Sequence, residues 1–493
     1  MSAARYPLLY QINTRVWLTE RSASLGRRAT LDDIPDAELD RLAALGFDWV
    51  WLLSVWQTGL AGQQVSRSNP AWRHEFEETL PDLREEDIAG SGFAITGYTV
   101  HANLGGDAAL ARLRERLRKR GLKLMLDFVP NHVGLDHPWT QTHPEYFIEA
   151  PAEVLQSQPD SYFRIASQGG EHFFALGRDP NFPAWPDTLQ LNYANPATQE
   201  AMIGELLKIA SQCDGVRCDM AMLLLPDVFE RTWGRRPADF WPTAIHRVRE
   251  QVPGFVFMAE VYWDLEWTIQ QQGFDYAYDK RLYDRLRDGH ARPVREHLYA
   301  DLDYQNKLAR FLENHDEPRA AATFAPDVHR AAAVITYLAP GLRFFQQGQF
   351  EGRKVRVSPH LIRGPQEPVD EETQAFYDRL LTVLQQPVVR EGQWQLLECT
   401  PAWDGNPTND CILVFVWQAP RQPALIVAVN FADHRSQCLV HLPLTNLGGT
   451  QWQLQDHLSP ASYPWNGDDL ERGLYLDMTP WQAQAFTLVS VST

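Results

Sequence analysis

Short apolar runs alternate with amphipathic segments along most of the chain. A strand buried on both faces of a parallel sheet is apolar throughout, whereas a surface helix repeats its apolar positions at the helical period. The alternation therefore predicts an α/β fold in which parallel strands form a barrel and helices surround it. The expected strands are 8–13, 48–55, a run from 122 that includes Asp127, 215–219, 255–260, 274–278, a run ending at 316, and 342–345.

Segments of helical length separate these runs, and some of them end at a glycine, which readily closes a helix. Two stretches interrupt the alternation. Residues 57–96 are expected to form a long loop in the wall of the site, because they exceed the length of a plain connection. Residues 133–186, rich in Pro, His, Phe and Tyr, are expected to form a short inserted domain after the third strand. The expected helices are 36–45, 107–120, 197–212, 238–251, 329–338 and 371–384.

After Gln386 the pattern changes to alternating apolar and polar positions separated by Pro, Gly, Asn and Asp, which is typical of antiparallel strands. The predicted organisation is a (β/α)8 barrel at 1–132 and 187–386, an insertion at 133–186, and a C-terminal all-β sandwich at 387–493. The expected strands of that last domain are 412–417, 424–430, 437–442 and 483–489.

Composition limits the possible partners. The 493 residues are enough for such a barrel and one further domain. A formal net charge of −18 argues against a nucleic-acid partner, because phosphate-backbone binding needs clustered Lys and Arg. No apolar stretch is long enough to span a membrane, and the first residues lack the pattern of a signal peptide. The five cysteines show no metal-ligand spacing, so free thiols in the cytoplasm are expected.

Acidic, basic and imidazole side chains gather at the ends of four expected strands. They are Asp127 and His132, Arg217 and Asp219, Glu260, and His315 and Asp316. The carboxyl ends of barrel strands meet at one face, where barrel enzymes place their chemistry. The sequence therefore predicts an enzyme whose site contains several carboxylates.

The segments that carry these side chains resemble the conserved regions of the α-amylase family of retaining glycoside hydrolases and transglycosylases. Residues 127–132, 215–219 and 313–316 are similar to its first, second and fourth regions, and Glu260 resembles the carboxylate of the third. Residues 190–192 resemble an auxiliary motif near the end of the family's inserted domain. The resemblance extends over the barrel, the insertion and the C-terminal domain.

The resemblance implies a role for three carboxyl groups. Asp219 is the expected nucleophile, and Glu260 is the expected general acid and base. Asp316 is expected to hold sugar hydroxyls and to stabilise the oxocarbenium-like transition state. Crowding by Asp219 and Asp316 is expected to raise the pKa of Glu260, as its role requires.

Other residues are expected to bind the substrate or to support those that do. Arg217 lies two residues before Asp219, so both side chains project to the same side of a strand and Arg217 can keep Asp219 ionised. The resemblance implies that His132 and His315 hydrogen-bond sugar hydroxyls. It also implies that Asp127 supports Arg217 from below.

Three further substrate-binding residues are expected. Residues 92–98 resemble the stretch after the family's second strand and contain Phe93 and Tyr98. Phe93 stands where the family usually has a stacking Tyr, so it keeps an aromatic platform without the hydroxyl. Arg319 follows the fourth region and is expected either to reach a neighbouring sugar or to form an ion pair at the start of a helix.

The chain departs from the family pattern at several positions. Met222 and Leu223 stand where many members have a Lys that contacts glucan and a His that is a calcium ligand, which predicts a more apolar acceptor side. Asn131 keeps a ligand-like position, but Gln190 stands where an acidic residue is frequent. Hard cations require several charged oxygens, so neither tightly bound calcium nor another cofactor is expected.

The resemblance implies hydrolysis, with retention, of α-linked glucosides such as malto-oligosaccharides or α-glucans. An α-glucan transglycosylase or a glucoside isomerase of the trehalose-synthase kind is the first alternative, since it uses the same residues and differs in whether water or a sugar attacks the intermediate. A non-catalytic carbohydrate-binding relative is the remote alternative, although such proteins typically lose the nucleophile or the acid. Chain-length preference, endo or exo attack and oligomeric state stay open.

Overall fold

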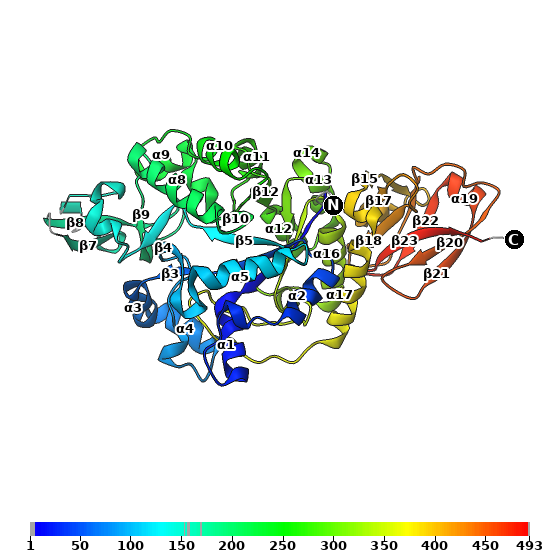
Figure 1. Cartoon of the computed structure of the whole chain (residues 1–493). Coiled ribbons are helices and arrows are strands. Elements are labelled where there is room, and N and C mark those ends of the chain that lie inside the picture. The colour runs from blue at the N-terminus through cyan, green and yellow to red at the C-terminus, as the bar shows by residue number, and fades with distance from the viewer. Residues whose placement is uncertain (1–4, 152, 155–157, 168–169, 492–493) are drawn as a thin grey trace.

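Eight parallel strands close into a barrel at the centre of the molecule (Figure 1). The computed structural model describes residues 5–151, 153–154, 158–167 and 170–491. The strands follow one another around the barrel in the order β1-β14-β13-β12-β11-β10-β5-β2, which confirms the predicted fold. Their bounds are β1 Leu8–Asn13, β2 Trp49–Leu53, β5 Lys123–Phe128, β10 Gly215–Cys218, β11 Val256–Ala259, β12 Tyr276–Tyr278, β13 Leu308–Arg310 and β14 Leu342–Gln346.

Helices cover the outside of the barrel, as the alternating pattern predicts (Figure 1). None of the helices in the described part of the chain is long and apolar enough to cross a membrane. The barrel helices are α1 Thr14–Leu25, α2 Asp36–Ala44, α5 Gly106–Arg118, α8 Pro196–Ala210, α9 Pro226–Trp233, α10 Trp241–Gln251, α11 Glu266–Gln271, α12 Lys280–Asp288, α13 Ala291–Leu298, α14 Leu302–Gln305, α15 Ala320–Thr323, α16 Pro326–Leu338, α17 Glu371–Leu384 and α18 Pro387–Glu391.

The seventh barrel strand lies earlier in the chain than the apolar pattern predicts. Strand β13 ends at Arg310, and the segment from Phe311 to Asp316 follows it as a loop. Phe311 and Leu312 are buried in the core. They are therefore apolar, and this makes the loop look like a strand in the sequence. The apolar pattern of the strand itself is interrupted by Arg310. This residue is completely buried and forms an ion pair with Asp279.

The expectation of a long loop over residues 57–96 is wrong, because most of this stretch is regular. Helices α3 (Leu60–Ser68) and α4 (Pro70–Thr79) lie between strands β3 (Trp56–Thr58) and β4 (Ile95–Val100), which pair with each other. Asn69 caps α4, since its side chain accepts hydrogen bonds from the N–H groups of Ala71 and Trp72. Pro70 is the first residue of the helix. The Asn-Pro pair was the sequence signal for this helix.

An antiparallel sheet of order β6-β9-β8-β7 extends from one end of the barrel (Figure 1). It begins directly after β5, and His132 at its start pairs with Gln190 at its end. The sheet thereby fixes one wall above the carboxyl ends of the barrel strands. Its strands are β6 His132–Gly134, β7 Tyr162–Ser167, β8 Gly170–Gly177 and β9 Trp185–Gln190.

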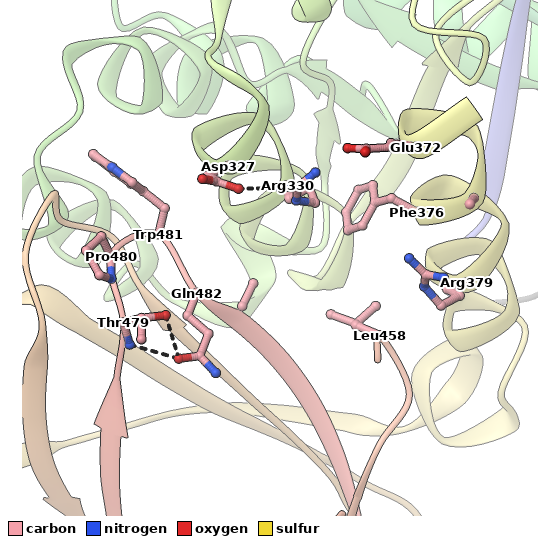
Figure 2. A pocket seen from close by; sticks show the side chains of 12 residues that line it. Asp327, Arg330, Glu372, Phe376, Arg379, Leu458, Thr479, Pro480, Trp481 and Gln482 are labelled. Atoms are coloured by element: carbon pink, nitrogen blue, oxygen red, sulfur yellow. Dashed lines mark hydrogen bonds and ion pairs between the residues drawn. The ribbon is translucent and has the colours of Figure 1, made fainter. Parts of the chain in front are cut away.

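Two antiparallel sheets follow the barrel, as predicted, in the orders β15-β17-β18-β23-β20-β21 and β16-β19-β22. The indole N–H of Trp417 in β17 donates to the carbonyl of Leu338 in α16, which ties the first sheet to the barrel at 2.8 Å. Figure 2 shows a cavity at this junction between Trp481, on the turn before β23, and side chains of α16 and α17. The strands are β15 Gln393–Leu397, β16 Cys399–Pro401, β17 Ile412–Gln418, β18 Leu425–Asn430, β19 Ser436–Val440, β20 Gln451–Asp456, β21 Ser462–Asn466, β22 Leu474–Met478 and β23 Ala483–Ser490.

Candidate active site

The predicted side chains meet at the carboxyl ends of three neighbouring barrel strands. Asp127 lies in β5 and Arg217 in β10, where the two residues are paired in register. Asp219 follows β10 directly, and Glu260 follows β11. All four side chains are buried, so their charges interact with little screening by solvent.

One guanidinium joins two of the carboxyl groups. Nη1 of Arg217 donates to Oδ1 of Asp219 at 2.6 Å, and Nη2 lies 2.7 Å from Oε2 of Glu260. Arg217 is fully buried, and its two-residue offset from Asp219 places both side chains on the same side of the strand. The two carboxyl groups are therefore held on the two arms of one rigid, planar cation.

Aromatic rings surround this guanidinium. Its central carbon lies 5.6 Å from the ring centre of Trp51, 5.3 Å from that of Phe93 and 5.8 Å from that of Tyr278. Burial disfavours the positive charge, but Glu260, Tyr278 and the other nearby acids raise the pKa of Arg217 well above its usual value. Arg217 is therefore a permanent positive charge in the site.

The carboxyl group of Glu260 titrates near neutral pH. Burial raises the pKa of this carboxyl to about 7; Asp219 and Asp316 raise it as well, while Arg217 opposes them. The backbone N–H of Met220 donates to Oε2 at 2.7 Å, and the hydroxyl of Tyr262 donates to Oε1 at 2.7 Å. A carboxyl that is fixed on both oxygens and titrates near neutrality suits a proton donor and acceptor.

Asp219 is in a different electrostatic position. Burial raises its pKa, and the ion pair and hydrogen bond with Arg217 oppose that rise directly. Its backbone N–H donates to the carbonyl of Phe128 at 2.8 Å. The next residue, Met220, has a φ of 42°, a left-handed conformation that is costly for a non-glycine residue. This turn aims the Met220 N–H at Glu260 while Asp219 stays on Arg217.

Asp316 is the accessible acid of the site. Its side chain is 44% exposed, whereas that of Glu260 is 4% exposed, so a ligand can reach it without displacing protein atoms. Burial of the surrounding pocket raises its pKa, but His315 and Arg217 lower it to about 2. Asp316 is therefore ionised throughout the neutral range.

His315 is fixed between a buried amide and Asp316. Nε2 of Gln11 lies 2.9 Å from Nδ1 of His315, and Nε2 of the imidazole lies 3.0 Å from Oδ2 of Asp316. An amide N–H donor at Nδ1 leaves the ring proton on Nε2, next to the carboxylate. Phe93 stacks on this ring with centroids 5.3 Å apart; contact of Phe93 with a sugar stays a prediction.

Asp127 and His132 precede the three acids in the chain. His132 is buried, its ring centre is 5.0 Å from that of Trp185, and burial lowers its pKa to about 3. It is therefore a neutral hydrogen-bonding group. Asp127 accepts from the indole N–H of Trp51 at 3.1 Å and from the N–H of Ser54 at 3.0 Å, which fits a supporting role.

Tyr98 and Arg319 make their polar contacts with other protein groups. The hydroxyl of Tyr98 donates to the carbonyl of Val129 and accepts from its N–H, both at 2.9 Å. Nη2 of Arg319 lies 2.8 Å from Oε1 of Glu313, and both Tyr98 and Arg319 are buried. Of the two alternatives for Arg319, the structure contains the ion pair; contact of either side chain with a sugar stays a prediction.

Several residues of the site were not predicted from the sequence. Tyr262 contacts Glu260, Gln11 contacts His315, and Tyr278 lies beside Arg217. Tyr262 follows Glu260 by two residues, and Gln11 is a polar residue inside an otherwise apolar strand. Gln11 was the clearer signal of a polar contact nearby, because a buried amide requires a hydrogen-bond partner.

Met222 and Leu223 do not form a polar or an apolar acceptor surface. They lie in the 3-10 helix Ala221–Leu224, and their exposed fractions are 0% and 3%. Both belong to the main hydrophobic core. The expectation that they shape the acceptor side is therefore wrong: they replace polar family residues by packing inward.

The position of a calcium ligand is occupied by a hydrogen-bonded amide pair. Nε2 of Gln190 donates to the carbonyl and the side-chain oxygen of Asn131, both at 3.0 Å, and to the carbonyl of Leu191 at 3.1 Å. One amide nitrogen therefore engages three oxygens that a hard cation would need. No cluster of three acidic, His or Cys ligands was found among the residues described. These residues do not fit a calcium ion.

Comparison with known proteins identifies the family of the chain. The family described as "Alpha amylase, catalytic domain" matches residues 30–361. The chain belongs to the α-amylase family. Relatives of the chain include proteins named as α-amylases and proteins named as maltosyltransferases.

Individual relatives are distant. Alpha-amylase MalA of Haloarcula japonica is 23% identical over 366 residues, which are 71% of this chain and 44% of that protein. An alpha-1,4-glucan:maltose-1-phosphate maltosyltransferase of Arcanobacterium haemolyticum is 23% identical over 462 residues, 87% of this chain and 60% of that protein. The crystal structure of the maltogenic α-amylase AmyB of Thermotoga neapolitana shares the fold, with a TM-score of 0.69 at 17% identity over 98% of this chain and 99% of that one. The chain spans about half the length of the curated relatives it matches, such as the two proteins from Haloarcula japonica and Arcanobacterium haemolyticum.

The pKa of Glu260 predicts the alkaline limb of the activity profile. A general acid must be protonated, so kcat/KM is expected to fall as pH rises above about 7. Tyr262→Phe removes a donor that favours the ionised carboxylate, so the limb is expected to move to higher pH, by up to about one unit. Profiles of kcat/KM against pH check this, with Tyr299→Phe, a change at an exposed tyrosine, as the control. A limb that moves to lower pH would contradict the assignment.

The amide pair predicts independence from calcium. A chelator is expected to leave the melting temperature of the native protein unchanged, because Gln190 already satisfies the oxygens around it. Gln190→Ala is expected to lower the free energy of unfolding by about 1–3 kcal/mol, since it leaves buried acceptors unpaired. Thermal melts with and without chelator measure both effects, and Gln395→Ala at an exposed position of β15 is the control. Chelator-induced destabilisation of the native protein would refute this interpretation.

Proposed function

We propose that this protein is a retaining hydrolase of α-linked glucosides, with malto-oligosaccharides or α-glucans as substrates. The observation that carries the proposal is the pair of carboxyl groups on Arg217: Asp219 at 2.6 Å and Glu260 at 2.7 Å. Retention requires two carboxyl groups about 5–5.5 Å apart, one as nucleophile and one as acid. Two groups held on the two arms of a single guanidinium are compatible with that spacing.

The proposed reaction has two steps. Asp219 attacks the anomeric carbon while Glu260 gives its proton to the departing glycosidic oxygen, so an ester forms as the glycosidic bond breaks. Glu260, now ionised, takes a proton from a water molecule, which attacks the same carbon and releases Asp219. Each step inverts the carbon, so the product keeps the α configuration.

The other residues are assigned by their state. Asp316 is proposed to bind sugar hydroxyls because its ionised carboxylate is accessible. His132 is proposed to do the same because its imidazole is neutral and can form hydrogen bonds without burying a charge. Phe93, stacked on His315, is proposed to contact the apolar face of the reacting sugar. Arg217 stabilises the carboxylates as their charges exchange between the steps.

Transglycosylation is the alternative with a specific observation in its favour. One relative with wide coverage of this chain is named a maltosyltransferase, and such a reaction needs the same nucleophile and acid. In that case a sugar hydroxyl replaces water in the second step. A non-catalytic role is less well supported, because Asp219, Glu260 and Asp316 are all retained.

Product analysis with maltotetraose distinguishes these functions. A hydrolase is expected to give only shorter sugars, while a transferase also gives longer ones or new linkages. Asp219→Asn is expected to reduce turnover by at least about 1,000-fold in either case, because the ester can no longer form. Chromatography of a time course measures both properties. Undiminished turnover by the Asp219→Asn protein would disprove the proposed mechanism.

A further inference from the structure

A second pocket, separate from the carboxylate site, is lined by basic side chains. It has a volume of about 530 Å³ and lies between α1, the start of α3 and the segment 101–104. None of its lining residues belongs to the group around Arg217. Its ionisable lining residues are Arg15, Arg28, Arg67, His101 and Glu86.

The charge of this pocket is opposite to that of the protein. The chain carries a formal net charge of −18, yet three arginines face one carboxylate here. That carboxylate, Glu86, already lies 3.6 Å from Nη1 of Arg84. The lining therefore carries a net positive charge, which favours small anions over cations.

Two of the three arginines, Arg15 and Arg28, are held in place by neutral groups. Arg15 is buried and donates to the carbonyl of Gly90 at 2.8 Å and to the hydroxyl of Thr58 at 3.2 Å. Arg28 donates through Nη1 to the side chain of Asn103 at 2.6 Å. Because these partners are uncharged, they orient the guanidinium groups without neutralising them.

Arg67 and His101 complete the donor set. Nε of Arg67 donates to the carbonyl of Ile88 at 3.3 Å and lies 3.9 Å from Glu85. Nδ1 of His101 accepts from the N–H of Asn103 at 3.1 Å, so its proton is on Nε2. Burial and the charges of Arg15 and Arg28 lower the pKa of His101, which makes it a neutral donor at neutral pH.

We propose that this pocket binds a phosphate group, either free or carried by a small sugar. Guanidinium forks match the oxygen geometry of phosphate, and three arginines line this pocket. Apolar side chains also line the pocket, namely Leu18, Leu60, Leu104 and Ile362, and its volume is within the usual range for a small organic ligand. Both features favour an organic phosphate over a bare ion.

The pocket adjoins the reacting site through one loop. Arg15 holds the carbonyl of Gly90, and the same loop continues to Phe93, whose ring stacks on His315. A ligand bound to Arg15 would thus lie next to the loop that leads to Phe93. The lining of the pocket nevertheless includes none of the three carboxyl groups of the reacting site.

Calorimetric titration at constant ionic strength tests the proposal with three probes: inorganic phosphate, glucose 6-phosphate and glucose. The native protein is expected to bind the two phosphates and not to bind glucose in this pocket. Arg28→Gln/Arg67→Gln is expected to weaken phosphate binding by about tenfold or more, since two charged donors are lost. Arg292→Gln/Arg472→Gln changes the net charge equally at exposed positions outside the pocket and is expected to have no effect.

The probes also identify the source of the phosphate. Tighter binding of glucose 6-phosphate than of phosphate indicates a sugar phosphate, and equal binding indicates the free ion. The Asp219→Asn protein is expected to bind both as the native protein does, which shows that this binding does not depend on the nucleophile. The proposal is overturned if the native protein binds neither phosphate, or if both double variants, with unchanged melting temperatures, lose binding equally.

Discussion

The arrangement of the site depends on the buried guanidinium of Arg217. Two carboxyl groups without a partner would be costly to bury, and removing the cation between them would leave that cost uncompensated. Arg217 lies in β10 and is paired in register with Asp127 of β5 on one side and Met258 of β11 on the other. Closure of the barrel therefore sets the position of the cation, and the cation sets the positions of Asp219 and Glu260.

The same cation separates the states of the acids. Asp219 receives a direct hydrogen bond from Arg217, whereas Glu260 combines its contact with deep burial and a pKa of about 7. Asp316 is exposed to the pocket and ionised. Three carboxyl groups within one cluster thus have three different environments, which is how one site can supply a nucleophile, a proton donor and a hydroxyl acceptor.

Much of this was predictable from the sequence, because buried strands and strand-end carboxylates leave local patterns. Leu8–Asn13 and Glu371–Leu384 have the predicted bounds, since apolar periodicity and flanking caps act locally. Strand β13 was misplaced because Arg310 is charged yet buried, and only the distant Asp279 explains that. The helices in 57–96 were missed although Asn69 and Pro70 mark one of them.

The inward packing of Met222 and Leu223 and the amide pair of Asn131 and Gln190 depend on tertiary contacts. A family pattern indicates which positions differ, but it does not say what a replaced side chain contacts instead. Here Met222 and Leu223 fill the core. Gln190 instead donates hydrogen bonds from its amide nitrogen to nearby oxygens. Both are physical solutions that become visible only once the chain is folded.

The configuration of the first product tests the central claim most directly. If Asp219 forms an ester, and Glu260 donates the proton in the first step and accepts one in the second, the product keeps the α configuration. Proton NMR of a maltotetraose digest must then show the new reducing end first as the α-anomer, before mutarotation. A first product in the β-anomer would mean a single displacement by water. That result would contradict the assignment of Asp219 as nucleophile and, with it, the account of the site built on Arg217.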